Sequence, residues 1–177
     1  MSDQPKLTIR QAVPGDEGAL ALVGSATFLE TYAHMIPGPD LVAHCATKHS
    51  PALYATWLAD PTVTIWIAET EAKAPVGYLL LTRATLPEAA PQPHDLEVQR
   101  IYVLSRFHRT GMGHALMNLA ISKAITRGAK RLVLGVHVDN SRALAFYKRQ
   151  GFAQIDDRKF AVGESIFCDF VLGRELH

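Results

Sequence analysis

Hydrophobic and polar residues follow one another along this chain with two different periods. Alternation with period two, as at Val63, Ile65 and Ile67, predicts a strand with one face buried. Apolar residues at helical spacing, as in residues 115–120, predict a helix. The predicted strands are residues 7–13, 62–69, 77–85, 97–103, 131–138, 152–160 and 165–172. The predicted helices are residues 16–32, 40–45, 114–127 and 141–150, and residues 51–58 are expected to be a further short helical piece.

The order of these elements predicts a mixed sheet. It reads β-α-α-β-β-β-α-β-α-β-β, an α/β (α+β mixed sheet) arrangement with helices on both faces. The length of 177 residues fits one domain, residues 1–177. The proline- and alanine-rich residues 86–93 are expected to be a loop, because the strand after them must pair with the hairpin before them.

Composition narrows the possible functions. A formal net charge of +1 gives no global field for nucleic acid. No apolar run approaches ~18 residues and the start MSDQPK is unlike a signal peptide, so we expect a cytoplasmic protein that is not embedded in a membrane. Cys45 and Cys168 form no CxxC pair, and we expect reduced thiols and no metal site.

The segment from the strand at 97–103 into the following helix has the pattern of an anion site. The first amides of a helix lack intrahelical partners and carry partial positive charge. Gly111 and Gly113 remove side chains that would keep a phosphate away, and Arg106 and Arg109 add positive charge. The turn lacks the P-loop ending and the three-glycine dinucleotide fingerprint. By itself it could equally be only a tight turn.

A second segment, residues 140–152, reads NSRALAFYKRQGF and makes the interpretation specific. Together the two segments resemble the GCN5-related N-acetyltransferase (GNAT) family. The matching positions are Gly111, Met112, Gly113, Asn140, Ala143, Tyr147, Gly151 and Phe152. This chain departs from the family's phosphate signature at one position, where His108 replaces Gln or Arg.

The resemblance implies a fold whose fourth and fifth strands splay apart, with acetyl-CoA (coenzyme A) in the gap. It implies that the pantetheine pairs with the backbone of residues 101–103, which are Ile101, Tyr102 and Val103. The implied contacts of the pyrophosphate region are His108, Arg109, Thr110, Gly111, Met112, Gly113, His114 and Ala115. Asn140 would bind a cofactor amide or cap the next helix.

The resemblance also implies catalytic roles. The N–H of Val103 would stabilise the oxyanion, and Tyr147 would protonate the leaving thiolate, unless its ring only packs the site. An alkyl amine with a pKa near ~10 needs a base. Glu97 is our first choice for this base, and the alternative is that Glu97 is an exposed carboxylate with no catalytic role. Asp95 and His137 are the other candidate bases.

Several segments are similar to the PaiA-type spermine/spermidine acetyltransferases, although that subgroup often has Trp at the position of His137. The implied acceptor is a polyamine or another small amine. The residues expected to bind it are Phe28, Glu30, Tyr32, Asp95, Glu97 and His137. The alternatives are a protein or peptide N-acetyltransferase and a non-catalytic acetyl-CoA sensor. The resemblance also suggests a possible homodimer.

Overall fold

The computed structural model describes residues 6–177. Residues 1–5, most of the segment in which no signal peptide is expected, lie outside the described residues. Within residues 6–177 no helix is both long and apolar enough to cross a membrane.

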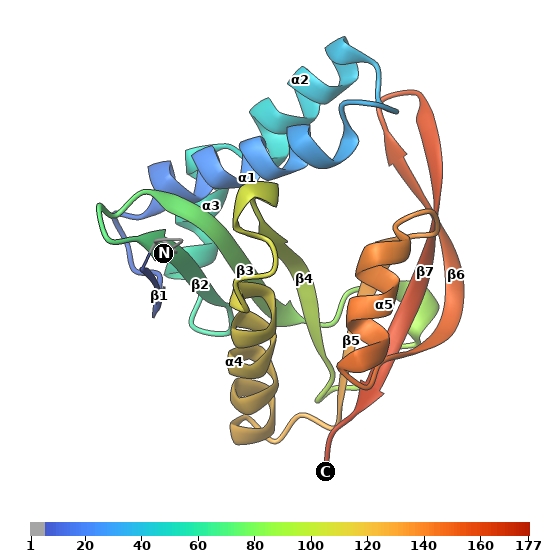
Figure 1. Ribbon diagram of the computed structural model, residues 1–177. Coiled ribbons are helices and arrows are strands. Elements are labelled where there is room, and N and C mark those ends of the chain that lie inside the picture. The colour runs from blue at the N-terminus through green and yellow to red at the C-terminus, as the bar shows by residue number, and fades with distance from the viewer. Residues whose placement is uncertain (1–5) are drawn as a thin grey trace.

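One sheet of seven strands, in the order β1-β2-β3-β4-β5-β7-β6, runs through the molecule (Figure 1). Neighbouring strands are antiparallel except for β4 and β5, which are parallel. The mixed sheet predicted from the sequence is thus confirmed. The strands are β1 Leu7–Gln11, β2 Thr64–Thr70, β3 Pro75–Arg83, β4 Leu96–Val103, β5 Arg131–His137, β6 Ala153–Val162 and β7 Ser165–Glu175.

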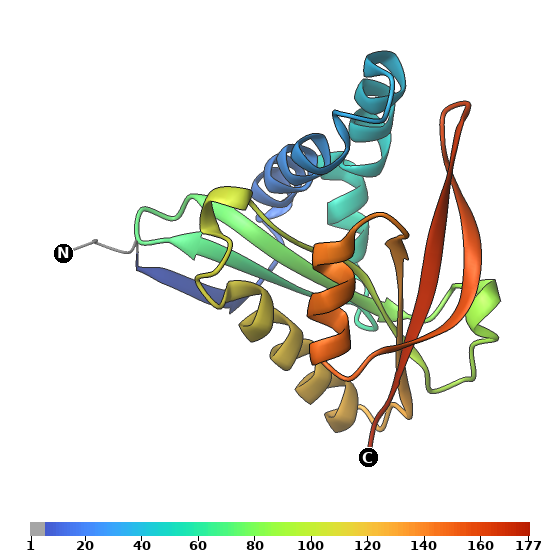
Figure 2. The ribbon, with the colours of Figure 1, turned by 45° about the vertical axis from the view of Figure 1, so that its right-hand side comes forward.

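Helices cover both faces of this sheet, as Figure 2 shows. They are α1 Glu17–Tyr32, α2 Gly38–Lys48, α3 Pro51–Ala59, α4 Met112–Thr126 and α5 Ser141–Arg149, with short 3-10 turns η1 Pro87–Ala89 and η2 Ser105–Phe107. Strand alternation sends β3 side chains to both faces. Tyr78 and Leu80 pack with α1 and α3, whereas Leu79 and Leu81 pack with α4.

The fourth and fifth strands touch only where they begin. Their pairing is limited to Leu96 with Leu132 and Glu97 with Val133. Beyond these pairs the strands diverge, and Figure 1 shows α5 beside the widening gap. From Val98 to Val103, β4 therefore has a strand partner on the β3 side alone.

A bulge in β4 determines which of its side chains face α4 and which face α1 and α3. Leu80 pairs with Arg100 and Leu81 pairs with Val98, so Gln99 is an extra residue on β4. Ile101 therefore joins Val98 on the α4 face, while Arg100 turns to the α1 and α3 face. Regular alternation would have placed Val98 and Arg100 on the same face.

Candidate active site

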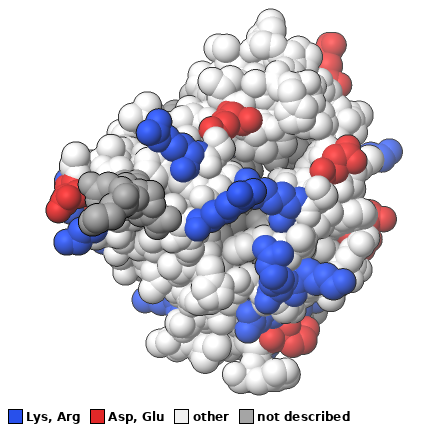
Figure 3. All heavy atoms as spheres, viewed as in Figure 1, with Lys and Arg blue, Asp and Glu red and all other residues white. Residues whose placement is uncertain are grey.

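A cavity of about 540 Å³ lies in the gap between β4 and β5. Its walls come from the end of α1, β4, the loop before α4, the first turn of α4, the end of β5 and α5. Arg109, Arg142 and Arg149 line it, and Figure 3 shows basic side chains gathered around a hollow on this face. Sequence reasoning missed the two arginines of α5. They precede and follow the matched Tyr147 on an exposed face that no pattern marked as functional.

The amino end of α4 opens into this cavity. Gly111 caps the helix with φ +85° and supplies no capping side chain. The first intrahelical hydrogen bond of this turn runs from the Ala115 amide to the Gly111 carbonyl at 2.9 Å, so the amides of Met112, Gly113 and His114 remain without intrahelical partners. A Cβ atom built on Gly111 would meet no atom within 4 Å. This open, amide-lined turn fits a phosphate group.

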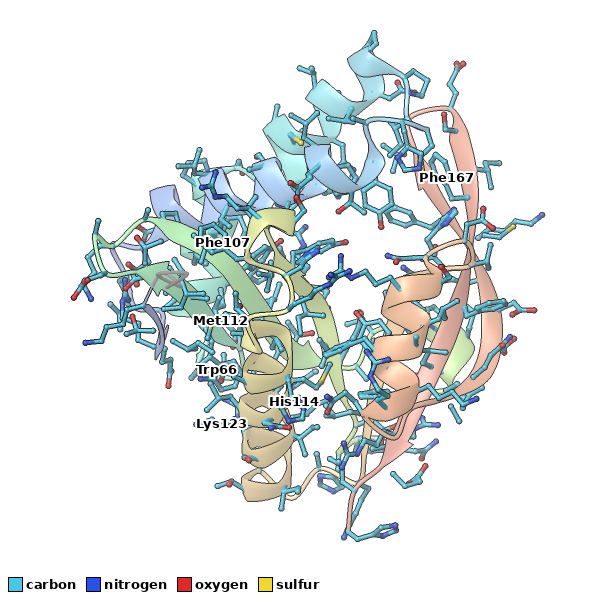
Figure 4. All side chains as sticks on the ribbon, viewed as in Figure 1. Trp66, Phe107, Met112, His114, Lys123 and Phe167 are labelled. Carbon is cyan, nitrogen blue, oxygen red and sulfur yellow. The ribbon has the colours of Figure 1, made fainter. Side chains whose placement is uncertain are left out.

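We call residues 109–114 the phosphate cradle. Arg109 also has a positive φ, +67°, which lets the chain turn sharply before Gly111. In Figure 4 Phe107, Met112 and His114 follow one another from η2 into α4. Arg109, Gly111, Met112, Gly113 and His114 all line the cavity, as expected from the sequence.

Two of the residues expected to contact the cofactor do not line the cavity. Ala115 does not line the cavity and its amide is used within α4. Thr110 does not line it either, because its hydroxyl donates to the Phe107 carbonyl at 2.7 Å and closes the turn. His108 does line the cavity, but its Nε2 donates to the Val103 carbonyl at 2.6 Å. Its Nδ1 is buried with no partner among residues 6–177.

The free edge of β4 presents backbone groups to the cavity. The amide of Leu104 donates to Val76 on β3 at 2.9 Å. In an antiparallel pair the hydrogen-bonded positions alternate, so Val103 and Ile101 direct their N–H and C=O groups away from β3. Both residues line the cavity. The Val103 carbonyl accepts a hydrogen bond from His108, whereas the N–H of Val103 remains available to a ligand.

Tyr147 closes the cavity from α5. The side chain of Asn140 caps this helix by accepting from the Ala143 amide at 3.1 Å, and both Asn140 and Tyr147 line the cavity. Tyr147 is 8% exposed and packs against Phe146 and Phe152. Burial, and secondarily Tyr102, raises the pKa of the Tyr147 phenol well above its ordinary value. The phenol therefore keeps its proton at neutral pH.

We define the acceptor end of the cavity as Glu30, Thr31, Tyr32, Arg100, Tyr102 and His137. The Glu30 carboxylate accepts from the amide and hydroxyl of Ser105 at 2.8 and 2.6 Å, which holds the end of α1 against η2. The Nδ1 atom of His137 accepts from the Asp139 amide at 3.2 Å, so a neutral His137 has its proton on Nε2. Burial raises the pKa of Tyr32 far above its ordinary value, with a further rise from Tyr102.

Three expected acceptor residues lie elsewhere. Glu97 is buried and accepts from the amide and hydroxyl of Thr85 at 2.8 and 2.9 Å. Asp95 forms an ion pair with Arg131 at 2.6 Å. Phe28 stacks on His44 at 4.1 Å inside a separate core cluster. None of the three lines the cavity. Glu97 and Asp95 lie at the start of β4, where β4 is still paired with β5 and the gap has not yet opened.

Arg100 is a charged acceptor-end residue that the sequence analysis missed. Its Nη1 lies 3.2 Å from Nδ1 of His49 and 3.1 Å from the Tyr54 hydroxyl. Its Cζ lies 4.9 Å from the centre of the Trp57 ring, close enough for a cation–π contact. The signal was present as a broken alternation in β4, where polar Gln99 and Arg100 stand side by side between Val98 and Ile101.

A splayed sheet, a phosphate cradle and a protonated tyrosine facing one cavity together define a transferase that uses an acyl-coenzyme A. Residues 29–152 match the model of the Acetyltransferase (GNAT) family. The chain belongs to this family and is an acetyl-CoA-dependent N-acetyltransferase.

The similar proteins agree on the fold and the general activity. An uncharacterized N-acetyltransferase of Mycobacterium tuberculosis is 32% identical over 161 residues, which cover 91% of this chain and 98% of that protein. The crystal structure of the PaiA N-acetyltransferase from Thermoplasma acidophilum with coenzyme A has a TM-score of 0.78 at 19% identity, over 96% of this chain and 99% of that one. The ribosomal-protein-S18-alanine N-acetyltransferase from Escherichia coli has a TM-score of 0.67 at 18% identity, over 97% and 94%. Since differently named transferases share this fold, the PaiA likeness does not define a subgroup.

Proposed function

We propose that this enzyme acetylates the primary amine of a small molecule by direct attack within a ternary complex. The observation that carries the proposal is that a protonated, buried Tyr147 shares one cavity with the phosphate cradle and the free edge of β4. The proton donor, Tyr147, and the backbone groups that would position the sulphur of the coenzyme thus line the same cavity.

Acetyl-CoA supplies the thioester that the amine attacks. The amides of residues 112–114 and the side chain of Arg109 hold the phosphates at one end. The outward backbone groups of Ile101 and Val103 orient the arm that leads to the sulphur. Apart from Arg109, these contacts use backbone atoms fixed by the helix and the strand, so little reorganisation is needed on binding.

Val103 and Tyr147 serve the chemical step. The N–H of Val103 donates to the carbonyl oxygen as negative charge develops there, a contribution of ~10²–10³ in rate for a typical donor of this kind. Tyr147 donates its phenolic proton to the departing sulphur. The raised pKa of Tyr147 keeps the phenol protonated until this step, and a proton from solvent or from the acetylated amine then reprotonates the phenolate.

The amine must lose its own proton before it attacks. With Glu97 and Asp95 outside the cavity, Glu30 is the one carboxylate in the wall that the structure describes. We propose that Glu30 attracts the ammonium group and accepts its proton through water. His137 is the weaker candidate, because its Nδ1 already accepts from the Asp139 amide.

The acceptor expected from the PaiA resemblance is a polyamine. A long polycation would need several carboxylates, whereas this wall holds Glu30 together with Arg100 and the arginines near the cradle. We therefore propose a small amine and regard spermidine as the less favoured acceptor. A thiol-release assay with acetyl-CoA tests this against a panel of small amines, spermidine, spermine and short peptides. Release with small amines is the expected result, and release with peptides alone would contradict the proposal.

A further inference from the structure

Within the described part of the chain, the positive charge of Arg100 has no counter-ion. The residue lines the cavity from β4, and within residues 6–177 its guanidinium takes part in none of the ion pairs. A charge that is partly removed from water normally has a charged partner, because burying an unpaired charge is unfavourable. An arginine of this kind beside a substrate cavity is a candidate binding group.

The groups that hold Arg100 in place are uncharged. Its Nη1 atom contacts His49 and Tyr54, and its plane lies near the Trp57 ring. Burial, followed by the Arg100 charge, lowers the pKa of His49 to about 3, so His49 is neutral at pH 7 and accepts from Arg100. These contacts orient the guanidinium without neutralising it.

The other edge of the guanidinium is free. In the part of the chain that the structure describes, Nε and Nη2 of Arg100 make no hydrogen bond, and neither is among the buried polar atoms without a partner. They therefore keep some exposure to solvent, and Arg100 is one of the residues that line the cavity. Nε and Nη2 form the parallel pair of donors that fits both oxygens of one carboxylate.

Arg100 is separated from the arginines that suit the coenzyme phosphates. Arg109 belongs to the cradle, and Arg142 and Arg149 lie on α5. The bulge at Gln99 instead directs Arg100 to the face covered by α1 and α3, opposite the face on which α4 packs. Its free donors therefore belong to the acceptor end.

We propose that Arg100 binds a carboxylate of the acceptor, so that the substrate is an amino acid or a closely related small molecule with both an amine and a carboxylate. This inference rests on the proposed function and specifies its acceptor. The volume of about 540 Å³ must also admit the thioester end of the coenzyme, which favours a small acceptor. The carboxylate lies on Arg100 while Glu30 attracts the ammonium group.

Pairs of amines that differ by one carboxylate test the proposal. Lysine is compared with cadaverine and phenylalanine with phenethylamine, and glycine with aminomethylphosphonate separates a carboxylate from another anion. We expect kcat/KM at least about tenfold higher for the carboxylate member, as expected when a hydrogen-bonded charge is lost. A preference for cadaverine, phenethylamine or spermidine would overturn the proposal.

Substitution of Arg100 connects that preference to the residue. Arg100→Gln, and Arg100→Lys, which keeps the charge but loses the paired donors, should lower the ratio of the two kcat/KM values by about 10- to 100-fold. The KM for acetyl-CoA should change little. Arg83→Gln removes an exposed arginine from the same sheet outside the cavity and should leave the ratio unchanged. An equal loss for both members of each pair would assign Arg100 a structural role.

A binding measurement separates failure of this inference from failure of the proposed function. If coenzyme A binds but no amine is acetylated, the proposed function fails. Calorimetry with the coenzyme-loaded protein then compares each amino acid with its decarboxylated partner, in wild type and in Arg100→Lys. Carboxylate-dependent binding that Arg100→Lys removes supports the inference, and its absence in the wild type overturns it. Melting temperatures confirm that each variant is folded.

Discussion

The two ends of the active-site cavity are built in different ways. The phosphate cradle uses the backbone of residues 109–114, set by two residues with positive φ and by the start of a helix. The acceptor end uses side chains from α1, β4 and β5, held by partners such as His49 and Ser105. The first depends on a few consecutive residues, whereas the second depends on how distant segments pack. Cofactor use can therefore be predicted from one short segment of the sequence, whereas acceptor choice cannot.

The largest effect should come from the group that lies between the two ends. Tyr147→Phe removes the proposed acid and should lower kcat by about 10²-fold or more, with little change in the KM for acetyl-CoA. Steady-state thiol release measures both values. Tyr78→Phe is the matched control, because Tyr78 is fully buried and its hydroxyl has no partner within residues 6–177. Equal kinetics for Tyr147→Phe and wild type would leave Tyr147 a packing role.

A change at the cradle should act on the cofactor alone. In Gly111→Val a branched side chain meets a φ of +85° and fills the open space beside the amides, so coenzyme A should bind at least about tenfold more weakly. Calorimetry measures the affinity. Gly15→Val imposes similar strain at φ +108°, also with no atom within 4 Å, but lies outside the cavity. Comparable losses in both variants would point to general destabilisation.

A smaller effect is expected at the acceptor end. Glu30→Gln removes the carboxylate proposed to attract the ammonium group and should raise the KM for the amine several-fold, since Glu30 is exposed and its charge is screened. Kinetics at several amine concentrations give the value. Glu71→Gln, at the exposed turn between β2 and β3, is the control. An unchanged KM in Glu30→Gln would remove Glu30 from the acceptor site.

Glu97 should matter for stability and not for turnover. Glu97→Gln weakens two hydrogen bonds from Thr85, at an expected cost of about 1–2 kcal/mol in the free energy of unfolding. Urea denaturation measures this cost, and thiol release should give a kcat close to wild type. A large fall in kcat with normal stability would restore Glu97 as the general base.

The last effect appears only at low pH and concerns the stability of the region near Arg100. The pKa of His49 is about 3 in the folded protein and ~6.5 when unfolded, so the unfolded state binds more protons below pH 6.5 and stability falls as the pH falls toward 3. His49→Gln should reduce this slope by up to about 1.4 kcal/mol per pH unit. Denaturation from pH 7 to pH 4 measures the slope. His34→Gln, which changes an exposed histidine, should match wild type.

Much of the fold followed from the sequence because period-two and helical patterns are local. The cradle could be predicted for the same reason, since Gly111 and its neighbours act through their own backbone. Glu97 and Asp95 could not be placed correctly, because their direction depends on partners from other segments, Thr85 and Arg131. Arg100 was missed since its orientation depends on the bulge at Gln99, which appears only when β4 pairs with β3.

The central claim is that the coenzyme lies in the gap between β4 and β5, with its phosphates on the cradle and its sulphur facing Tyr147. A crystal structure of the complex with coenzyme A tests it most directly. The account predicts phosphate oxygens within hydrogen-bond distance of the amides of residues 112–114, and the sulphur within reach of the Tyr147 hydroxyl. Coenzyme bound elsewhere, or a Tyr147 hydroxyl directed away from the sulphur, would contradict it.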